Sequence, residues 1–139
     1  MTNQLDGDDD ITSPIDRAPR ARVLVVDDDP LSRDVVGTRL RRDGYDVYEA
    51  SNGDEALAMV DDVDLLVLDI HMPGRSGITI LRELRRRHCA IPTLLVTGSP
   101  NPGLYTMANV LEARVLLKPI ALDRLSDAAI RSILARQQA

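Results

Sequence analysis

The sequence has no phenylalanine or tryptophan and only three tyrosines among its 139 residues, so its core has to be built from aliphatic side chains. Cys89 is the only cysteine, which excludes an internal disulfide. No apolar run is long enough to span a membrane, and the polar, acidic first twenty residues do not resemble a signal peptide. We therefore expect a cytoplasmic protein that does not bind membranes.

Positive charge is also scarce. The chain has 17 basic and 22 acidic residues, for a formal net charge of −5. Nucleic-acid binding depends mainly on contacts between cations and phosphates, so we expect no nucleic-acid partner. All basic residues are arginine except Lys118. A compact ammonium group suits a point contact to a phosphoryl group, which makes this single lysine a candidate functional residue.

The length and the order of hydrophobic patterns predict one folded domain after a polar tail. Residues 1–21 are rich in acidic residues and proline and are predicted to be disordered. Residues 22–136 alternate short apolar runs with helical periodicity. The strands are expected at 22–27, 46–50, 64–69, 92–97 and 114–117, and the helices at 30–43, 53–61, 77–88, 104–112 and 121–136. This (βα)5 order predicts an α/β, doubly wound, five-stranded parallel sheet of the flavodoxin-like type.

Helical spacing also predicts which residues face the core. In the first helix the expected buried stripe consists of Leu31, Val35, Val36 and Leu40. In the last helix the expected inward positions are Leu122, Leu125, Ala129 and Ile133.

Four predicted strands end in polar residues of different chemistry: Asp27 and Asp28, Asp69, Thr97, and Lys118. The carboxyl ends of parallel strands lie at one edge of the sheet, where open α/β sheets bind ligands. Acids there can hold a hard cation, and the cation, lysine and hydroxyl together can hold a phosphoryl group. Each residue alone has an ordinary structural explanation, as a helix cap, a turn former or a strand residue. Four together at one edge indicate a site.

The motifs that carry these residues resemble the receiver domain of response regulators in two-component signalling, in its stand-alone, single-domain form. They are VLVVDD, LDIHMPGRSG, LLVTG and LLKPI, in that order along the chain. The resemblance implies that Asp69 is the phosphoacceptor and that Thr97 and Lys118 contact the phosphoryl group. It also implies a Mg²⁺ site formed by Asp27, Asp28, Asp69 and the backbone carbonyl of His71.

The resemblance assigns further roles around this site. The side chains of His71 and Ser99 would flank the phosphoryl group and tune its hydrolysis. The alternative for His71 is an exposed loop residue whose backbone carbonyl alone has a role. The bond before Pro119 is expected to be cis. Val115 stands where the family carries an aromatic residue, so we predict that the usual threonine–aromatic relay is altered. The family's Gly-Ala turn is missing before residue 114, so the fourth helix and its link are predicted to be shortened or displaced.

The predicted function is a phosphoryl-accepting switch or phosphorelay intermediate, not a turnover enzyme. The donor would be a histidine kinase or a histidine phosphotransfer protein, and the output would be altered binding to a downstream protein. The apolar residues Met107, Val110 and Leu111 would allow a homodimer.

Two other functions remain open from the sequence. One is a receiver-like interaction module that is not phosphorylated, which the altered relay favours. The other is a phosphatase of the haloacid dehalogenase type, with Asp27 as nucleophile, Thr97 as its hydroxyl and Lys118 as its lysine. That reaction gives no role to Asp69 and lacks a further acidic residue at a later strand end. The chain could also be a fragment of a longer regulator.

Overall fold

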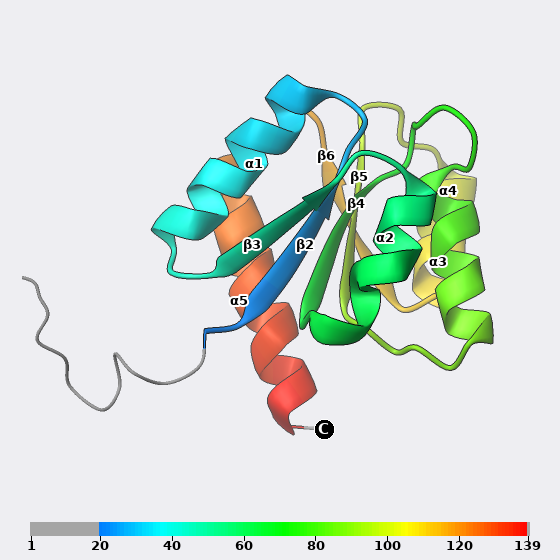
Figure 1. The fold of residues 1–139 in the computed structure, drawn as a ribbon. Helices are drawn as coiled ribbons and strands as arrows, with labels where there is room; N and C mark the ends of the chain where they lie inside the picture. The colour runs from blue at the N-terminus through cyan, green and yellow to red at the C-terminus, as the bar shows by residue number, and fades with distance from the viewer. Residues whose placement is uncertain (1–19, 139) are drawn as a thin grey trace, which may run out of the picture.

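A computed structural model of the chain describes residues 20–138, which form a five-stranded parallel sheet with helices on both faces (Figure 1). The strands are β2 (Arg22–Val26), β3 (Asp46–Ala50), β4 (Leu65–Asp69), β5 (Thr93–Thr97) and β6 (Ala113–Leu117). Their order across the sheet is β3-β2-β4-β5-β6. The predicted doubly wound (βα)5 architecture is confirmed. Residues 1–19 of the predicted disordered tail (residues 1–21) lie outside the described residues.

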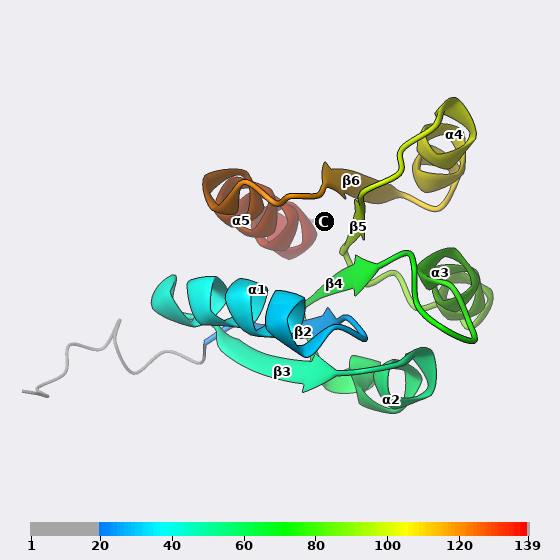
Figure 2. The same cartoon turned by 90° about the horizontal axis from the view of Figure 1, so that it is seen from above.

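The helices form a layer on each face of the sheet, as the view from above shows (Figure 2). One layer contains α1 (Pro30–Arg42) and α5 (Leu122–Gln138), and the other contains α2 (Gly53–Met59), α3 (Gly77–Arg86) and α4 (Pro102–Val110). A short 3₁₀ turn, η1 (Val60–Asp62), follows α2. Among the described residues, no helix combines the length and the apolar character needed to cross a membrane.

The alternation of side chains along each strand divides the aliphatic core in two. On β2, Val23 and Val25 pack toward α1 and α5, whereas Leu24 and Val26 pack toward α2, α3 and α4. All five residues of β4 are buried, because this central strand is covered on both faces. The two edge strands, β3 and β6, are only partly buried. Asp69 therefore stands at the end of a strand that is buried along its whole length.

The buried stripe of α1 differs from the one predicted. Val36 and Leu40 are buried as expected, but Leu31 is 72% exposed and Val35 is 46% exposed. Successive residues of a helix are rotated by about 100°, so only one of the neighbours Val35 and Val36 can face the sheet squarely. Leu31 and Val35 instead line a surface groove with Pro119 and Ile120. In α5 the prediction is closer, with Leu125, Ala129 and Ile133 buried and Leu122 partly buried.

Helix α4 and its link to β6 also differ from the expected boundaries. The helix begins at Pro102, two residues earlier than predicted, because Asn101 caps it by accepting a hydrogen bond from the Leu104 N–H. It ends at Val110, and Glu112 takes a left-handed conformation with φ of 58° immediately before β6. Arg85 from α3 donates to the Leu111 carbonyl at 2.8 Å and so fastens this turn. A short link thus forms without glycine.

Candidate functional site

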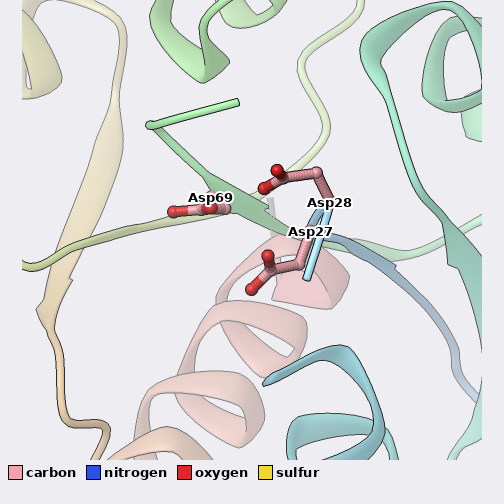
Figure 3. A group of neighbouring side chains, drawn as sticks. All are labelled: Asp27, Asp28 and Asp69. Carbon is pink, nitrogen blue, oxygen red and sulfur yellow. The ribbon is translucent and has the colours of Figure 1, made fainter. Parts of the chain in front are cut away.

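Three carboxylates meet at the carboxyl edge of the sheet (Figure 3). Asp27 and Asp28 follow β2, and Asp69 is the last residue of β4. One carboxylate oxygen from each lies within 4.8 Å of the others. Asp27 is 6% exposed and Asp69 is 4% exposed, whereas Asp28 is open to solvent. Like charges this close repel one another, so the cluster favours a cation at its centre.

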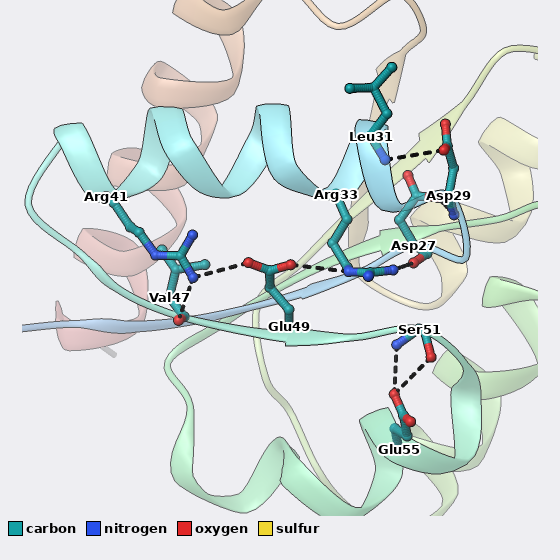
Figure 4. Close-up of polar contacts among 9 residues, drawn as sticks. All are labelled: Asp27, Asp29, Leu31, Arg33, Arg41, Val47, Glu49, Ser51 and Glu55. Carbon is teal, nitrogen blue, oxygen red and sulfur yellow. Dashed lines mark hydrogen bonds and ion pairs between the residues drawn. The ribbon is translucent and has the colours of Figure 1, made fainter.

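The turn after β2 fixes the position of Asp27 (Figure 4). Its Oδ1 accepts a hydrogen bond from the Asp29 N–H at 2.9 Å, and its backbone carbonyl accepts one from Arg33 Nη1 at 2.7 Å. The same guanidinium binds Glu49 on β3 through Nε. Asp29 caps α1 by accepting a hydrogen bond from the Leu31 N–H. Sequence reasoning missed Arg33, because only the fold brings its guanidinium to the end of β2.

The end of β4, which carries Asp69, lies in close contact with the start of α3. The Gly77 N–H donates to the Ile70 carbonyl at 2.9 Å. A Cβ at Gly77 would lie 2.5 Å from the Asp69 carbonyl oxygen and 3.0 Å from the Ile70 Cα, so no larger residue fits without moving the strand end. This contact of Gly77 was not predicted from the sequence. The place of this glycine at the start of α3, after the capping residue Ser76, was the available signal.

Lys118 contacts the acidic cluster through its side chain and the end of β5 through its backbone. Its Nζ lies 3.4 Å from Asp69 Oδ1 and 3.5 Å from Asp27 Oδ2. Its backbone N–H donates to the Thr97 carbonyl at 2.8 Å, which joins the ends of β5 and β6. The following bond, to Pro119, is cis, as expected from the resemblance. The lysine therefore faces both buried carboxylates.

The electrostatic environment of Asp69 opposes its negative charge. Burial raises the pKa of its carboxyl above the ordinary value, and the Asp27 charge raises this pKa further, whereas Lys118 and the His71 backbone N–H lower it. Asp69 Oδ1 is buried and has no hydrogen-bond partner among the described residues. The Lys118 ammonium, 3.4 Å away, is its charged neighbour, and an oxygen that accepts no hydrogen bond of normal geometry is also available to a bound cation.

The Thr97 side chain lies at the same edge and is fully buried. Its Oγ1 accepts a hydrogen bond from the Ser99 N–H at 3.0 Å. The His71 Nε2 lies 3.2 Å from the same hydroxyl oxygen, although the His71 residue as a whole is exposed. The structure thus brings His71 and Thr97 into direct contact, and Ser99 is linked to Thr97 through its backbone. Sequence reasoning did not foresee the bond between the two side chains.

Val115 is separated from Thr97 along the sheet. It pairs in register with Leu95, and Leu117 is the residue opposite Thr97. Val115 and Leu117 line a groove of about 450 Å³ between α4 and the start of α5, and the exposed Tyr105 of α4 lines the same groove. Tyr105 belongs to α4 and not to β6, but it lies near Val115 because α4 packs along β6.

The residues present fit a divalent cation with oxygen ligands. The three carboxylates can each offer one oxygen, and the unpartnered Asp69 Oδ1 lies next to them. Carboxylate oxygens in small number suit Mg²⁺, which keeps several of its waters. Asp27 Oδ1 is occupied by the Asp29 N–H, so it is less free than the exposed Asp28 carboxylate to bind an ion directly.

Comparison with known proteins gives a consistent result. Residues 23–130 match the model of the response regulator receiver domain. The transcriptional regulatory protein TrcR of Mycobacterium tuberculosis is 38% identical over 122 residues, which cover 83% of this chain and 46% of TrcR. The transcriptional regulatory protein CpxR of Klebsiella pneumoniae is 37% identical over 116 residues, covering 83% of this chain and 50% of CpxR.

Among solved structures, the chemotaxis protein CheY4 of Vibrio cholerae matches with a TM-score of 0.76 at 29% identity, covering 81% of this chain and 98% of CheY4. The chain spans half or less of the length of the curated relatives TrcR and CpxR. What the rest of those proteins does is therefore not transferred to this chain.

Proposed function

Because this chain belongs to the response regulator receiver domain family of two-component signalling, we propose that it is a phosphoryl-accepting switch with Asp69 as the phosphoacceptor. One observation carries the choice of residue. Asp69 Oδ1 is buried, accepts no hydrogen bond of normal geometry from the described residues and is paired with the Lys118 ammonium, whose Nζ lies 3.4 Å away. The carboxylate is thus a nucleophile beside a cation that can neutralise an incoming phosphoryl group.

The proposed transfer begins from a phosphohistidine of a histidine kinase or a histidine phosphotransfer protein. An Asp69 carboxylate oxygen attacks the phosphorus, the P–N bond breaks, and its electron pair stays on the imidazole nitrogen, which then takes a proton. The product is an acyl phosphate on Asp69. Lys118 neutralises charge on the phosphoryl oxygens, and the Thr97 hydroxyl donates a hydrogen bond to one of them.

The acidic cluster supports a requirement for Mg²⁺. Asp28 and Asp69 are the proposed direct ligands, together with the His71 backbone carbonyl, and Asp27 is proposed to act through water. When bound, Mg²⁺ would offset the repulsion between the carboxylates and the incoming phosphoryl group. Asp27 is held in place by Asp29 and Arg33, so it is preorganised for this role.

Reversal needs only water. Attack of water on the phosphorus releases inorganic phosphate and regenerates the Asp69 carboxylate. The protein would thus be a phosphoacceptor that returns to its starting state and not a turnover enzyme. The added charge of about −1.5 to −2 at the sheet edge is the signal that alters binding to a downstream protein.

An apolar surface beside the site supports docking of the donor protein. Leu31 and Val35 of α1 are exposed and line a groove whose other wall includes Lys118 and Ile120. We expect a Leu31→Ser variant to accept a phosphoryl group from acetyl phosphate at the wild-type rate, but more slowly from a phosphorylated histidine kinase that modifies the wild type. Equal rates from the kinase would contradict this docking site.

The decisive experiment is intact-protein mass measurement after incubation with acetyl phosphate and Mg²⁺. We expect a labile gain of one phosphoryl group that is lost in Asp69→Asn and after removal of Mg²⁺. Asp34→Asn, which removes an exposed carboxylate from α1, is the matched control and should gain the group normally.

Two outcomes would favour the alternatives. No gain and no Mg²⁺ binding would favour a non-phosphorylated interaction module. Steady phosphate release that survives Asp69→Asn and needs Asp27 would favour a phosphatase of the haloacid dehalogenase type. The hydrogen bond that the Asp29 N–H donates to Asp27 Oδ1 argues against the latter, because it reduces the nucleophilicity of that oxygen.

A further inference from the structure

The contact between His71 and Thr97 links an exposed side chain to a fully buried one. His71 lies in the loop after β4, two residues past Asp69, and Thr97 ends β5. The His71 Nε2 and the Thr97 Oγ1 are 3.2 Å apart, within hydrogen-bond distance. Because Thr97 is 0% exposed, water cannot take the place of the imidazole without a local rearrangement.

The hydroxyl of Thr97 has one proton and two lone pairs. The Ser99 N–H already donates to its oxygen at 3.0 Å. Among the described residues, the His71 ring is the side chain that contacts this hydroxyl. If the ring is in the tautomer with hydrogen on Nδ1, then Nε2 accepts the hydroxyl proton, and the proton is committed to His71.

The proposed function requires the same proton for a different acceptor. A phosphoryl group on Asp69 carries charged oxygens, which are stronger acceptors than a neutral imidazole nitrogen. Thr97 has only one proton and cannot donate to both. In the tautomer with hydrogen on Nδ1, phosphorylation and the His71–Thr97 bond therefore compete directly.

We propose that His71 is a positioning residue that holds the Thr97 hydroxyl in the unphosphorylated protein and is released to solvent when the phosphoryl group takes that hydroxyl. The proposal rests on the proposed function of Asp69. It gives His71 a side-chain role as the reporter of phosphorylation at the surface. An aliphatic Val115, in register with Leu95, has no polar atom with which to sense the hydroxyl.

The first test is a spectroscopic signature of the imidazole. Proton–nitrogen correlation spectra of the nitrogen-labelled full chain, at one fixed pH, distinguish an imidazole locked in one tautomer from a solvated ring. We expect His71 to be locked in the tautomer with hydrogen on Nδ1. Adding Mg²⁺ and beryllofluoride, a phosphoryl mimic that binds carboxylates, should convert its signals to those of a solvated ring. His88, which is exposed and lies past the end of α3, is the internal reference and should not change.

A variant without the hydroxyl gives an independent comparison. Thr97→Val should give the solvated His71 signals even without beryllofluoride. The proposal is wrong if His71 signals are the same in Thr97→Val and wild type, or if they stay unchanged when beryllofluoride binds. Because the Thr97→Val comparison needs no phosphoryl group, it tests the bond even if Asp69 is not phosphorylated.

The second test is kinetic. Removing His71 frees the hydroxyl in advance, so His71→Ala should accelerate phosphoryl gain from acetyl phosphate by about two- to tenfold, the range of one net hydrogen bond. His88→Ala is the matched control and should keep the wild-type rate. In a Thr97→Ala background the effect of His71→Ala should vanish, which a general structural role of His71 would not produce.

The outcomes separate this proposal from the proposed function. Phosphoryl gain on Asp69 with unchanged His71 signals would overturn the His71 proposal alone. Absence of phosphoryl gain in the wild type would overturn the proposed function and, with it, the release of His71. An equal effect of His71→Ala with and without the Thr97 hydroxyl would also overturn the His71 proposal.

Discussion

Lys118 is the residue whose position explains most about the site. It is the single lysine in the chain, and its Nζ lies 3.5 Å or less from both buried carboxylates. An arginine, the residue used everywhere else in this chain for positive charge, would place a larger, planar group there. The compact ammonium can contact two carboxylates now and phosphoryl oxygens after transfer.

We predict that Lys118→Gln slows phosphoryl gain from acetyl phosphate about 100-fold, because it removes a donor that stabilises charge in the transition state. The initial rate of the mass gain measures this. Lys118→Arg should recover less than a tenth of the lost rate. A wild-type rate in Lys118→Gln would mean that the lysine contacts the carboxylates only for stability.

The environment of Asp69 in the fold disfavours its charged form and so lowers the stability of the protein at neutral pH. The pKa of Asp69 is raised in the fold, mainly by burial and then by Asp27. The folded state thus binds this proton more tightly than the unfolded state. The stability contributed by the protonated carboxyl is fully present below its ordinary pKa and is lost as the pH rises through the raised value.

We therefore predict that Asp69→Asn increases the free energy of unfolding at neutral pH. Urea unfolding in the presence of a chelator measures it. The difference from wild type should shrink as the pH falls below the ordinary carboxyl range. Glu55, whose pKa is lowered by hydrogen bonds from Ser51, is present in both proteins, and its contribution cancels. Greater stability of the wild type at neutral pH would contradict the prediction.

At the scale of elements, helix starts decide where the site residues lie. Asp29, Asn52, Ser76 and Asn101 each accept a hydrogen bond from the first turn of their helix. Three of these four helices follow strands that end near the site, so the caps fix the chain just after those strands. Helix α4 begins at Pro102 and not at the predicted residue 104, and Asn101-Pro102 has the same pattern of a capping residue before proline as Asp29-Pro30.

Gly77 has no side chain and therefore allows the start of α3 to pack directly against the end of β4, which carries Asp69. A Cβ at this position would meet the backbone of Asp69 and Ile70, which cannot move as a flexible side chain does. We predict that Gly77→Ala lowers the free energy of unfolding by about 1–3 kcal/mol and also slows phosphorylation of Asp69. Urea unfolding and the mass assay measure the two effects.

Gly103→Ala is the control at the start of α4. Its added methyl would approach only the Asn101 side chain, and alanine favours the helix. It should therefore be as stable as wild type or more so. If Gly77→Ala behaved like Gly103→Ala, then the strand end would be free to shift, and α3 would not position Asp69.

At the scale of the whole molecule, the parallel sheet brings acidic side chains together at its carboxyl edge. The packed aliphatic layers on both faces hold the three carboxylates close together, and a bound cation stabilises only the folded state that assembles them. We predict that Mg²⁺ at about 100 times its dissociation constant raises the free energy of unfolding by about 2.7 kcal/mol.

The measurement is urea unfolding with and without Mg²⁺. Asp28→Asn should lose most of the gain, because it removes an exposed ligand, whereas Asp34→Asn should keep it. A gain of equal size in Asp28→Asn would show that the ion binds elsewhere on this acidic protein.

The order of strands and helices along the chain could be predicted from the sequence, and therefore also which residues share the carboxyl edge of the sheet. This follows because apolar periodicity sets each element, and parallel connection forces the strand ends to one side. Asp27, Asp28, Asp69, Thr97 and Lys118 meet there as predicted. The family resemblance rested on the same motifs and is confirmed.

The burial of individual helix residues and the contacts among the site residues could not be predicted from the sequence, because they depend on segments far apart in the chain. Packing against the sheet decided that Val36 and not Val35 is buried. The approach of α3 decided that position 77 must lack a side chain. The distance between the loop after β4 and the end of β5 allows His71 to reach Thr97. The packing around Asp69 Oδ1 leaves it paired with Lys118 and without a hydrogen bond of normal geometry among the described residues. No local pattern encodes these distances, since each is set by how separate elements pack.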